Sequence, residues 1–335
     1  MLEKEKVEHL KSGALPRRSY KVGGSALAGA RLGLPLIIFV AVIVIAALLT
    51  PGFFTVANAR AILTNSALIG IVAVSMTPIM LSGNFISLAT QQSAMAGMVL
   101  FVALVGGGLN WVLAAVAVLV LLVMINLLQA WVIGLGLNPI ITTLAAGAVI
   151  FGAVSLTTGS GIVRMGEFSV PWGDADPLGI PLEVYMFVIF TTVVGLVSAK
   201  TVVGRQVLLL GANRDTARVS GISQTLVTSF AFLVFAFGLA IVAILNGAAF
   251  GEATVNSFDG LTISAIAAML VGGSAIQGGS GSTINSAFGA VFIAIAGNLM
   301  TLNALSTGQR LFVEGLIVIL AVLSIQLIRN RRGFA

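Results

Sequence analysis

The sequence predicts an all-α polytopic membrane protein with about ten transmembrane helices. Of its 335 residues, 58% are hydrophobic and only 8% are charged, whereas soluble domains carry about 25% charged residues. Long apolar stretches, separated by short polar connections, recur along the whole chain. Because so few charges cannot cover the surface of a soluble globule, the repeated stretches indicate a bundle of membrane helices.

Ten apolar stretches predict the individual helices, and most are long enough to cross a hydrocarbon core of ~30 Å at about 1.5 Å per residue. They are residues 34–50, 61–81, 88–105, 111–132, 139–158, 183–199, 226–245, 262–276, 284–302 and 311–328. The stretch 262–276 is short and rich in small residues, which leaves open whether it crosses the whole bilayer. No small-x-small cleavage site follows the first stretch, which indicates a retained helix and not a signal peptide.

The polar segments define the expected domain organisation. We expect a cytoplasmic tail at 1–30, one transmembrane domain at 31–329 and a cytoplasmic tail at 330–335. Within the domain, a cytoplasmic loop is expected at 200–222 and an external loop at 159–182.

Basic residues predict the orientation. Fourteen of the seventeen Lys and Arg residues fall on one side of a ten-helix arrangement with both termini in the cytoplasm. Such a bias follows the positive-inside rule. The three basic residues expected outside are Arg60, Arg164 and Arg310.

A weak internal similarity is compatible with two inverted five-helix halves. Ile86-Ser87 leads into a run of small residues that ends at Gly97, and Ile263-Ser264 leads into a similar run that ends at Gly272. Inverted repeats are common in transporters.

Several kinds of chemistry are excluded by residues that the sequence lacks. The chain has no Cys and a single His, His9 in the polar tail, so it offers no thiolate, no disulfide and no His-based metal site. No Gly-Lys pair occurs, so there is no P-loop and the chain is not expected to hydrolyse ATP. No acid or Lys lies in the middle of a predicted membrane helix, which argues against ion coupling. Any energy that the chain uses is therefore expected to come from a partner.

The stretch Gly204–Ile222, GRQVLLLGANRDTARVSGI, is the only sizeable polar interruption with several basic residues. Asn213 is suited to cap a short helix that runs through Arg218, and Gly221 is suited to end it. The stretch is either a topological anchor that keeps a basic loop in the cytoplasm, or a docking surface for a partner.

This stretch resembles the segment GRxIYAxGGNxxAARLSGI of permease subunits of ABC importers, in the branch for ribose, xylose, arabinose and galactose. The chain departs from that segment at Ala212 and Thr216. In the family, the segment supplies a coupling helix that fits a cleft on the ATPase. The resemblance assigns this ATPase-coupling role to Gly204, Arg205, Asn213, Arg214, Asp215, Ala217, Arg218, Ser220 and Gly221.

Three other segments carry the same resemblance. The stretch 262–281 is similar to the family's ELDAIAAVVLGGxSLxGGxG, and 82–90 is similar to GGIDLSVGS. The stretch 126–144 is similar to NGxxVxxxxIPxFIxTLG. Acidic positions of the family are neutral here, at Phe85, Thr262 and Ser264.

The glycine-rich stretch Gly272–Gly281 has two interpretations. By itself it mimics a phosphate-binding loop, but such a loop follows a strand and opens a helix within a βαβ unit. Here it lies between membrane helices, so we favour a tight turn where backbones approach closely.

The resemblance implies the permease subunit of an ATP-driven importer for a sugar or similar small polar solute, in the bacterial inner (plasma) membrane. The implied partners are an ABC ATPase that carries ATP and Mg, a periplasmic solute-binding protein and a second permease subunit, identical or paralogous. Transport would proceed by alternating access within membrane lipids, with no cofactor bound by this chain. No nucleic-acid partner is expected, since the basic residues flank apolar segments instead of interleaving with aromatic residues.

Uncharged polar residues within the helices are candidates for the solute pathway, because amides and hydroxyls can both donate and accept hydrogen bonds. The candidates are Gln91, Gln92, Asn126, Thr142, Thr143 and Asn246. The alternative for each is a hydrogen bond between helices, which polar groups in membranes commonly make.

Charged residues on the expected external side are candidates for contact with a binding protein, because rim charges guide encounter. They are Arg164, Glu167, Asp174, Asp176, Glu252 and Asp259. The long loop at 159–182 is equally compatible with a plain solvated connection.

Two other classes of function stay open on the sequence. A stand-alone secondary carrier or channel would transport without an ATPase, and if ion-coupled it would need an intramembrane titratable group. A membrane scaffold or intramembrane enzyme is the third hypothesis, although no Cys, His or paired carboxylate lies within the expected helices.

Overall fold

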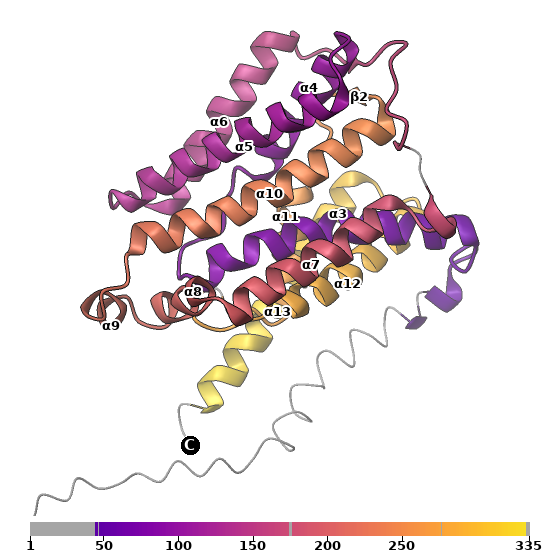
Figure 1. Ribbon diagram of the computed structural model, residues 1–335. Coiled ribbons are helices and arrows are strands. Elements are labelled where there is room, and N and C mark those ends of the chain that lie inside the picture. Colours follow the sequence, from indigo (N-terminus) through magenta and orange to yellow (C-terminus); the bar gives the residue numbers. More distant parts are fainter. Residues whose placement is uncertain (1–43, 46, 174–175, 276, 333–335) are drawn as a thin grey trace, which may run out of the picture. The chain divides into compact units, whose positions relative to one another are not determined.

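The computed structural model describes residues 44–332 apart from 46, 174–175 and 276, with side chains as far as residue 320 (Figure 1). This part of the chain is built from helices, apart from two strands of two residues each and a 3-10 turn, η1 (Pro177–Gly179). The helix expected at 34–50 and the tail at 1–30 lie almost entirely outside the described residues. The helices are α3 (Val56–Leu81), α4 (Thr90–Gly106), α5 (Trp111–Gly134), α6 (Pro139–Thr158), α7 (Leu182–Lys200), α8 (Val202–Ala212), α9 (Arg214–Val219), α10 (Gln224–Phe250), α11 (Leu261–Val271), α12 (Thr283–Leu302) and α13 (Thr307–Arg332).

The expected all-α architecture is confirmed, and each of the nine apolar stretches from 61 onward contains a helix. Among the described residues, six helices are long and apolar enough to cross a membrane: α3, α5, α6, α7, α10 and α12. Two others are shorter apolar helices, α4 and α11. The count of ten crossings stays a prediction.

The centre of the bundle is formed by α3, α10 and α12. Most residues in the apolar windows of these three helices are buried, whereas few of those in α5, α6 and α7 are. The helices α3 and α10 pack along each other (Figure 1), and Gly238 permits their close approach, because an added Cβ would collide with Ser75. Most exposed side chains of α5, α6 and α7 are large and apolar, which suits a surface in contact with lipid.

The helix α10 defines the two ends of the bundle. It starts a few residues after α9 and finishes just before β2 (Glu252–Ala253), which pairs antiparallel with β1 (Val163–Arg164). Figure 1 shows α9 and β2 at opposite ends of α10. We call them the α9 end and the strand end.

The helix α4 begins inside the bundle. At the α9 end, Asn84 donates to Thr228 Oγ1 at 3.0 Å, in the second turn of α10. Residues 84–87 then continue without regular structure to the start of α4, where the backbone N–H of Leu88 donates to Thr143 Oγ1 of α6 at 3.2 Å. Irregular backbone at membrane depth is tolerated where protein buries it, and Ser87 and Ala89 are fully buried here.

Candidate functional site

The polar stretch after α7 folds into two helices, of which the sequence predicted only the second. In α8, Val207 and Leu210 are buried against Leu81 and Val227, while the opposite face is exposed. The hydroxyl of Thr201 accepts from the N–H of Gly204 at 3.1 Å and caps the first turn. The amphipathic pattern of α8 was masked by its place within a stretch that appears polar as a whole.

The helix α9 is capped at both ends, as predicted. Asn213 Oδ1 accepts from the N–H of Thr216 at 3.0 Å, which fixes the N-terminus. At the other end, the N–H of Ile222 donates to Ala217 O at 3.0 Å and that of Gly221 donates to Arg218 O at 3.1 Å. This pair of bonds is the Schellman motif, and Gly221 has the left-handed conformation that it requires (φ 76°). Six residues thus form a well-defined helix.

Within the part of the chain that the structure describes, most of the surface of α9 is exposed and available to a partner. Ala217 is its only buried residue and packs into the cluster that also holds Leu210 and Val227. The other five residues of α9 are exposed, among them Asp215. Val219 is 91% exposed, and an apolar side chain in that position is available to a protein partner.

The basic residues of this region have different roles. Arg205 and Arg218 are exposed, and the described structure gives neither side chain a hydrogen bond or ion pair. Arg214, in contrast, donates through Nη2 to Gly83 O at 2.7 Å and to Asn84 Oδ1 at 3.1 Å. Arg214 therefore ties α9 to the connection between α3 and α4.

Three backbone segments meet at the end of α8: the last turn of α8, the end of α3 and the glycine-rich loop. An added Cβ on Gly211 would collide with Leu81 O and would lie 2.6 Å from the nitrogen of Gly279. An added Cβ on Gly278 would lie 2.5 Å from the Cα of Gly83. The N–H of Gly279 donates to Leu81 O at 3.0 Å. We call this contact of the ends of α3 and α8 with the loop at 278–279 the glycine junction.

The glycine junction explains the glycine-rich stretch as a place of close backbone approach, as we favoured from the sequence. The backbone N–H groups of Gly272, Gly273, Ser274, Ala275, Gly278 and Gly279 all donate to backbone carbonyls. Donors that are already paired cannot cradle a phosphate, so the phosphate-loop alternative is not supported.

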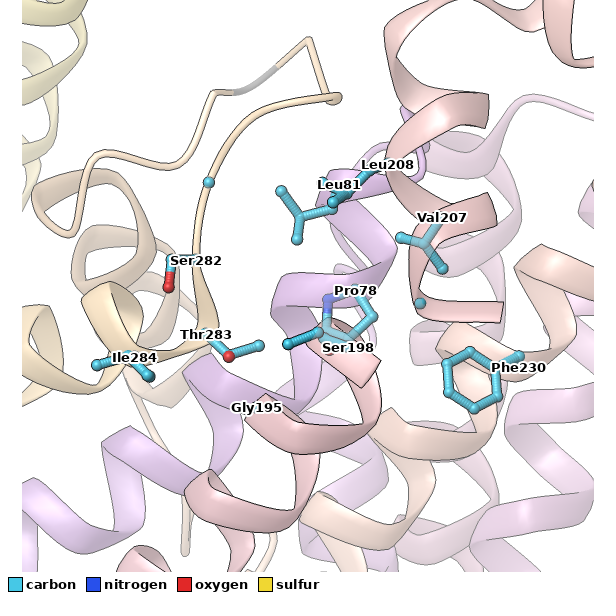
Figure 2. Close-up of a pocket in the computed structure, with 13 residues that line it drawn as sticks. Pro78, Leu81, Gly195, Ser198, Val207, Leu208, Phe230, Ser282, Thr283 and Ile284 are labelled. Atoms are coloured by element: carbon cyan, nitrogen blue, oxygen red, sulfur yellow. The ribbon is translucent and has the colours of Figure 1, made fainter. Parts of the chain in front are cut away.

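A cavity of about 200 Å³ lies next to the glycine junction (Figure 2). Its walls come from α3, α7, α8, α10 and the start of α12, and they are mostly apolar. Figure 2 shows Leu81, Val207 and Phe230 around it, with Ser282 and Thr283 on the other side. None of the predicted pathway residues lines this cavity.

The predicted pathway residues are spread over α4, α5, α6 and α10. Asn126 and Thr143 are fully buried and bond to carbonyls of their own helices, at Leu122 and Pro139. Asn246 does the same with Val242 O at 3.2 Å. These bonds fit the alternative of internal hydrogen bonding.

Three of the candidates, Asn126 among them, keep a side-chain atom that could still form a hydrogen bond. Within the described structure, Gln92 Oε1, Asn126 Oδ1 and Thr142 Oγ1 are buried without a hydrogen-bond partner. Gln129, one turn after Asn126 on α5, is also buried, and neither its Nε2 nor its Oε1 has a hydrogen-bond partner in the described structure. Gln91 differs, since its side chain is bonded to Asp259.

Three of the six predicted binding-protein contacts form ion pairs. Arg164 pairs with Glu252 at 3.1 Å across the two strands, and Asp176 pairs with Arg60 at 2.8 Å. Glu167 is exposed in the loop after β1, and Asp174 lies outside the described residues. Asp259 stands apart from these, because it is bonded to the first turn of α4.

The sequence did not single out Asn84 and Asn58, which connect helices that are far apart in the chain. Asn84 joins Ser82, Thr228 and Arg214, and Asn58 exchanges two hydrogen bonds with Asn298, at 3.0 and 2.7 Å. Both arrangements join residues far apart in the chain, so no local pattern reveals them.

The described residues thus form a bundle of helices, six of them of membrane-spanning length, with a short, capped and exposed helix at one end. No cluster of potential metal ligands occurs among the described residues. The chain belongs to the family described as branched-chain amino acid transport system / permease component, whose sequence model matches residues 58–322.

Individual relatives agree with this membership. The chain is 28% identical over 293 residues to the probable ABC transporter permease protein YphD of Escherichia coli (strain K12), covering 85% of this chain and 86% of the relative. It is 26% identical over 294 residues to the ribose import permease protein RbsC of the same strain, covering 86% and 91%. It is 27% identical over 289 residues to the L-arabinose transport system permease protein AraH, also of that strain, covering 86% and 88%. No solved structure gives a significant match. The family and these relatives identify the chain as a transport permease subunit and not an enzyme.

Proposed function

We propose that this chain is the membrane-spanning subunit of an ATP-driven importer of a sugar or similar small polar solute, and that α9 is the helix on which the ATPase acts. The observation that carries the proposal is the form of α9. It is capped at both ends, exposed on its outer face and bonded inward through Arg214. A loop that only fixes the topology needs basic residues and no defined structure. A coupling helix must be rigid and must be connected to the transmembrane helices that change position.

The connection from α9 runs towards the interior. Arg214 bonds to Gly83 and Asn84, and the irregular segment that follows leads to the start of α4 inside the bundle. The glycine junction joins the same segment to the connection between α11 and α12. A displacement of α9 would therefore reach both short helices, which is the kind of coupling that alternating access requires.

The arrangement of neighbours supports two inverted halves. The helix α4 contacts α10, α5 and α6, and α11 correspondingly contacts α3, α12 and α13. The long helices repeat the pattern, since α10 packs on α5 and α3 packs on α12. Exchanging α3 for α10, α4 for α11, α5 for α12 and α6 for α13 reproduces these contacts, which supports halves related by an inverted repeat.

The partners follow from the same proposal. An ABC ATPase with ATP and Mg would dock on α9 in the cytoplasm, and a periplasmic solute-binding protein would dock at the strand end. A second permease subunit would complete the transporter in the bacterial inner membrane, with both termini of each chain in the cytoplasm. The relatives named for ribose and L-arabinose import support a sugar as the solute.

Co-purification with the ATPase tests this proposal. The tagged chain, extracted in mild detergent, is expected to carry an ATPase, and the double variant Arg205→Glu, Arg218→Glu is expected to lose it. Lys200→Glu is the matched control, because it reverses an exposed charge at the same end but outside the segment Gly204–Gly221 that is proposed to dock on the ATPase. A chain that purifies alone and still moves solute into liposomes would instead establish a stand-alone carrier.

A further inference from the structure

The N-termini of the two short helices meet inside the bundle. Gln91, in the first turn of α4, donates through its backbone N–H to Thr262 Oγ1 at 3.2 Å and through Nε2 to Asp259 Oδ1 at 2.7 Å. Thr262 lies in the first turn of α11, and Asp259 directly precedes its N-cap, Gly260. We call Gln91, Asp259 and Thr262 the α4–α11 junction.

This junction lies between the ends of the long helices and not beyond them. The neighbouring Gln92 has its Oε1 3.4 Å from the position of an added Cβ on Gly147. Gly147 is eight residues from the start of α6 and eleven from its end, or about 12 and 16 Å at 1.5 Å per residue. On the other side, Ser264 donates to Glu314 Oε2 at 3.0 Å, and Glu314 is about 10 Å beyond the first residue of α13.

Asp259 brings an exposed charge to this depth. Its side chain is exposed, and within the described part of the chain no Lys or Arg forms an ion pair with it and its Oδ2 has no hydrogen-bond partner. A carboxylate in hydrocarbon is costly, and intramembrane charges therefore face a bundle interior or water-filled cavity. Val149, on α6 near Gly147, is 72% exposed and apolar, as expected of a surface that faces lipid.

We propose that the α4–α11 junction lines a water-filled passage for the solute, where Asp259 and Gln91 accept hydrogen bonds from a neutral solute that carries several hydroxyl groups. The two oxygens without a partner in the described structure, Asp259 Oδ2 and Gln91 Oε1, are both acceptors. Neighbouring acceptors match a solute with neighbouring donors, such as an aldose. This inference rests on the proposed importer function and adds to it the place and chemical class of recognition.

Thiol labelling tests the passage without knowledge of the solute. The chain has no Cys, so Asp259→Cys, Gln91→Cys and the control Val149→Cys each introduce a single thiol into the tagged chain, which is purified with its co-extracted subunits and placed in nanodiscs. The reagent is the charged methanethiosulfonate MTSET, which reacts with thiolates, a form that apolar surroundings suppress. We expect Cys at 259 or 91 to react at least ~10-fold faster than Cys at 149. Equal, slow labelling of all three would overturn the passage.

Uptake by whole cells tests the solute class separately. The probes are radiolabelled D-ribose, L-arabinose, D-xylose and D-galactose, in cells that express the whole transporter. For any aldose that the wild type accumulates, Asp259→Leu is expected to abolish uptake, whereas Asp259→Asn, which keeps an acceptor but no charge, is expected to retain a measurable rate with raised KM. Equal loss in both variants would contradict recognition of a neutral solute. A wild type that accumulates none of the four would contradict the sugar importer itself, while the labelling result would still decide the passage.

Discussion

The glycine junction predicts a large effect from the smallest possible substitution, Gly211→Ala. Gly211 lies in the last turn of α8, where the backbones of α3 and of the glycine-rich loop approach it. The added methyl group would collide with Leu81 O and lie 2.6 Å from the nitrogen of Gly279. These two atoms share a hydrogen bond of 3.0 Å, so the methyl group cannot be accommodated without separating the segments that carry them.

The magnitude follows from three contributions. Inserting a methyl group into a closely packed region costs about 1–3 kcal/mol, and losing the hydrogen bond from Gly279 to Leu81 costs about 1 kcal/mol. Alanine favours a helix over glycine by about 1 kcal/mol, which offsets part of the loss. We therefore expect Gly211→Ala to lower the free energy of unfolding by about 1–3 kcal/mol.

The assay is unfolding of the purified chain by increasing SDS in mixed micelles, followed by circular dichroism. Gly152→Ala is the matched control, because Gly152 is also helical but an added Cβ there would have no atom within 4 Å apart from its own helix backbone. The control is expected to be unchanged or more stable by at most about 1 kcal/mol. If Gly211→Ala were as stable as Gly152→Ala, the close approach of the three backbones would be refuted.

Three further predictions follow from single contacts. Asn213→Ala removes the cap bond at 3.0 Å and should destabilise α9 by about 1 kcal/mol, seen as faster hydrogen exchange of its amides; unchanged exchange would argue against the cap. Arg214→Gln should leave the ATPase bound but lower transport per ATP hydrolysed, because the bonds to the α3–α4 connection are lost; normal coupling would show that Arg214 is only a surface residue. Asn298→Leu leaves the buried Asn58 Oδ1 without a donor, although Asn58 Nδ2 keeps its bond to Phe53 O at 2.8 Å. The change should cost about 1–3 kcal/mol, of which the double variant with Asn58→Leu should recover a part; additive losses would contradict the pairing.

Local patterns in the sequence determined the long helices and the caps of α9. Hydropathy located the long helices to within a few residues, because a membrane helix must satisfy its own backbone and present apolar side chains to lipid. The N-cap Asn213 and the C-terminal Gly221 acted through neighbours within a few residues of the chain. Such effects are readable without knowledge of the fold.

The tertiary structure decided which polar residues meet. The resemblance assigned Arg214 the same role as Arg218, but only the fold brings Gly83 and Asn84, some 130 residues earlier in the chain, next to Arg214. Sequence analysis likewise grouped Asp259 with the external charges such as Glu252. Hydropathy cannot show that the connection after α10 reaches the first turn of α4, where Asp259 bonds to Gln91. Contacts between residues so distant in the chain depend on the packing of whole helices, and no local periodicity encodes them.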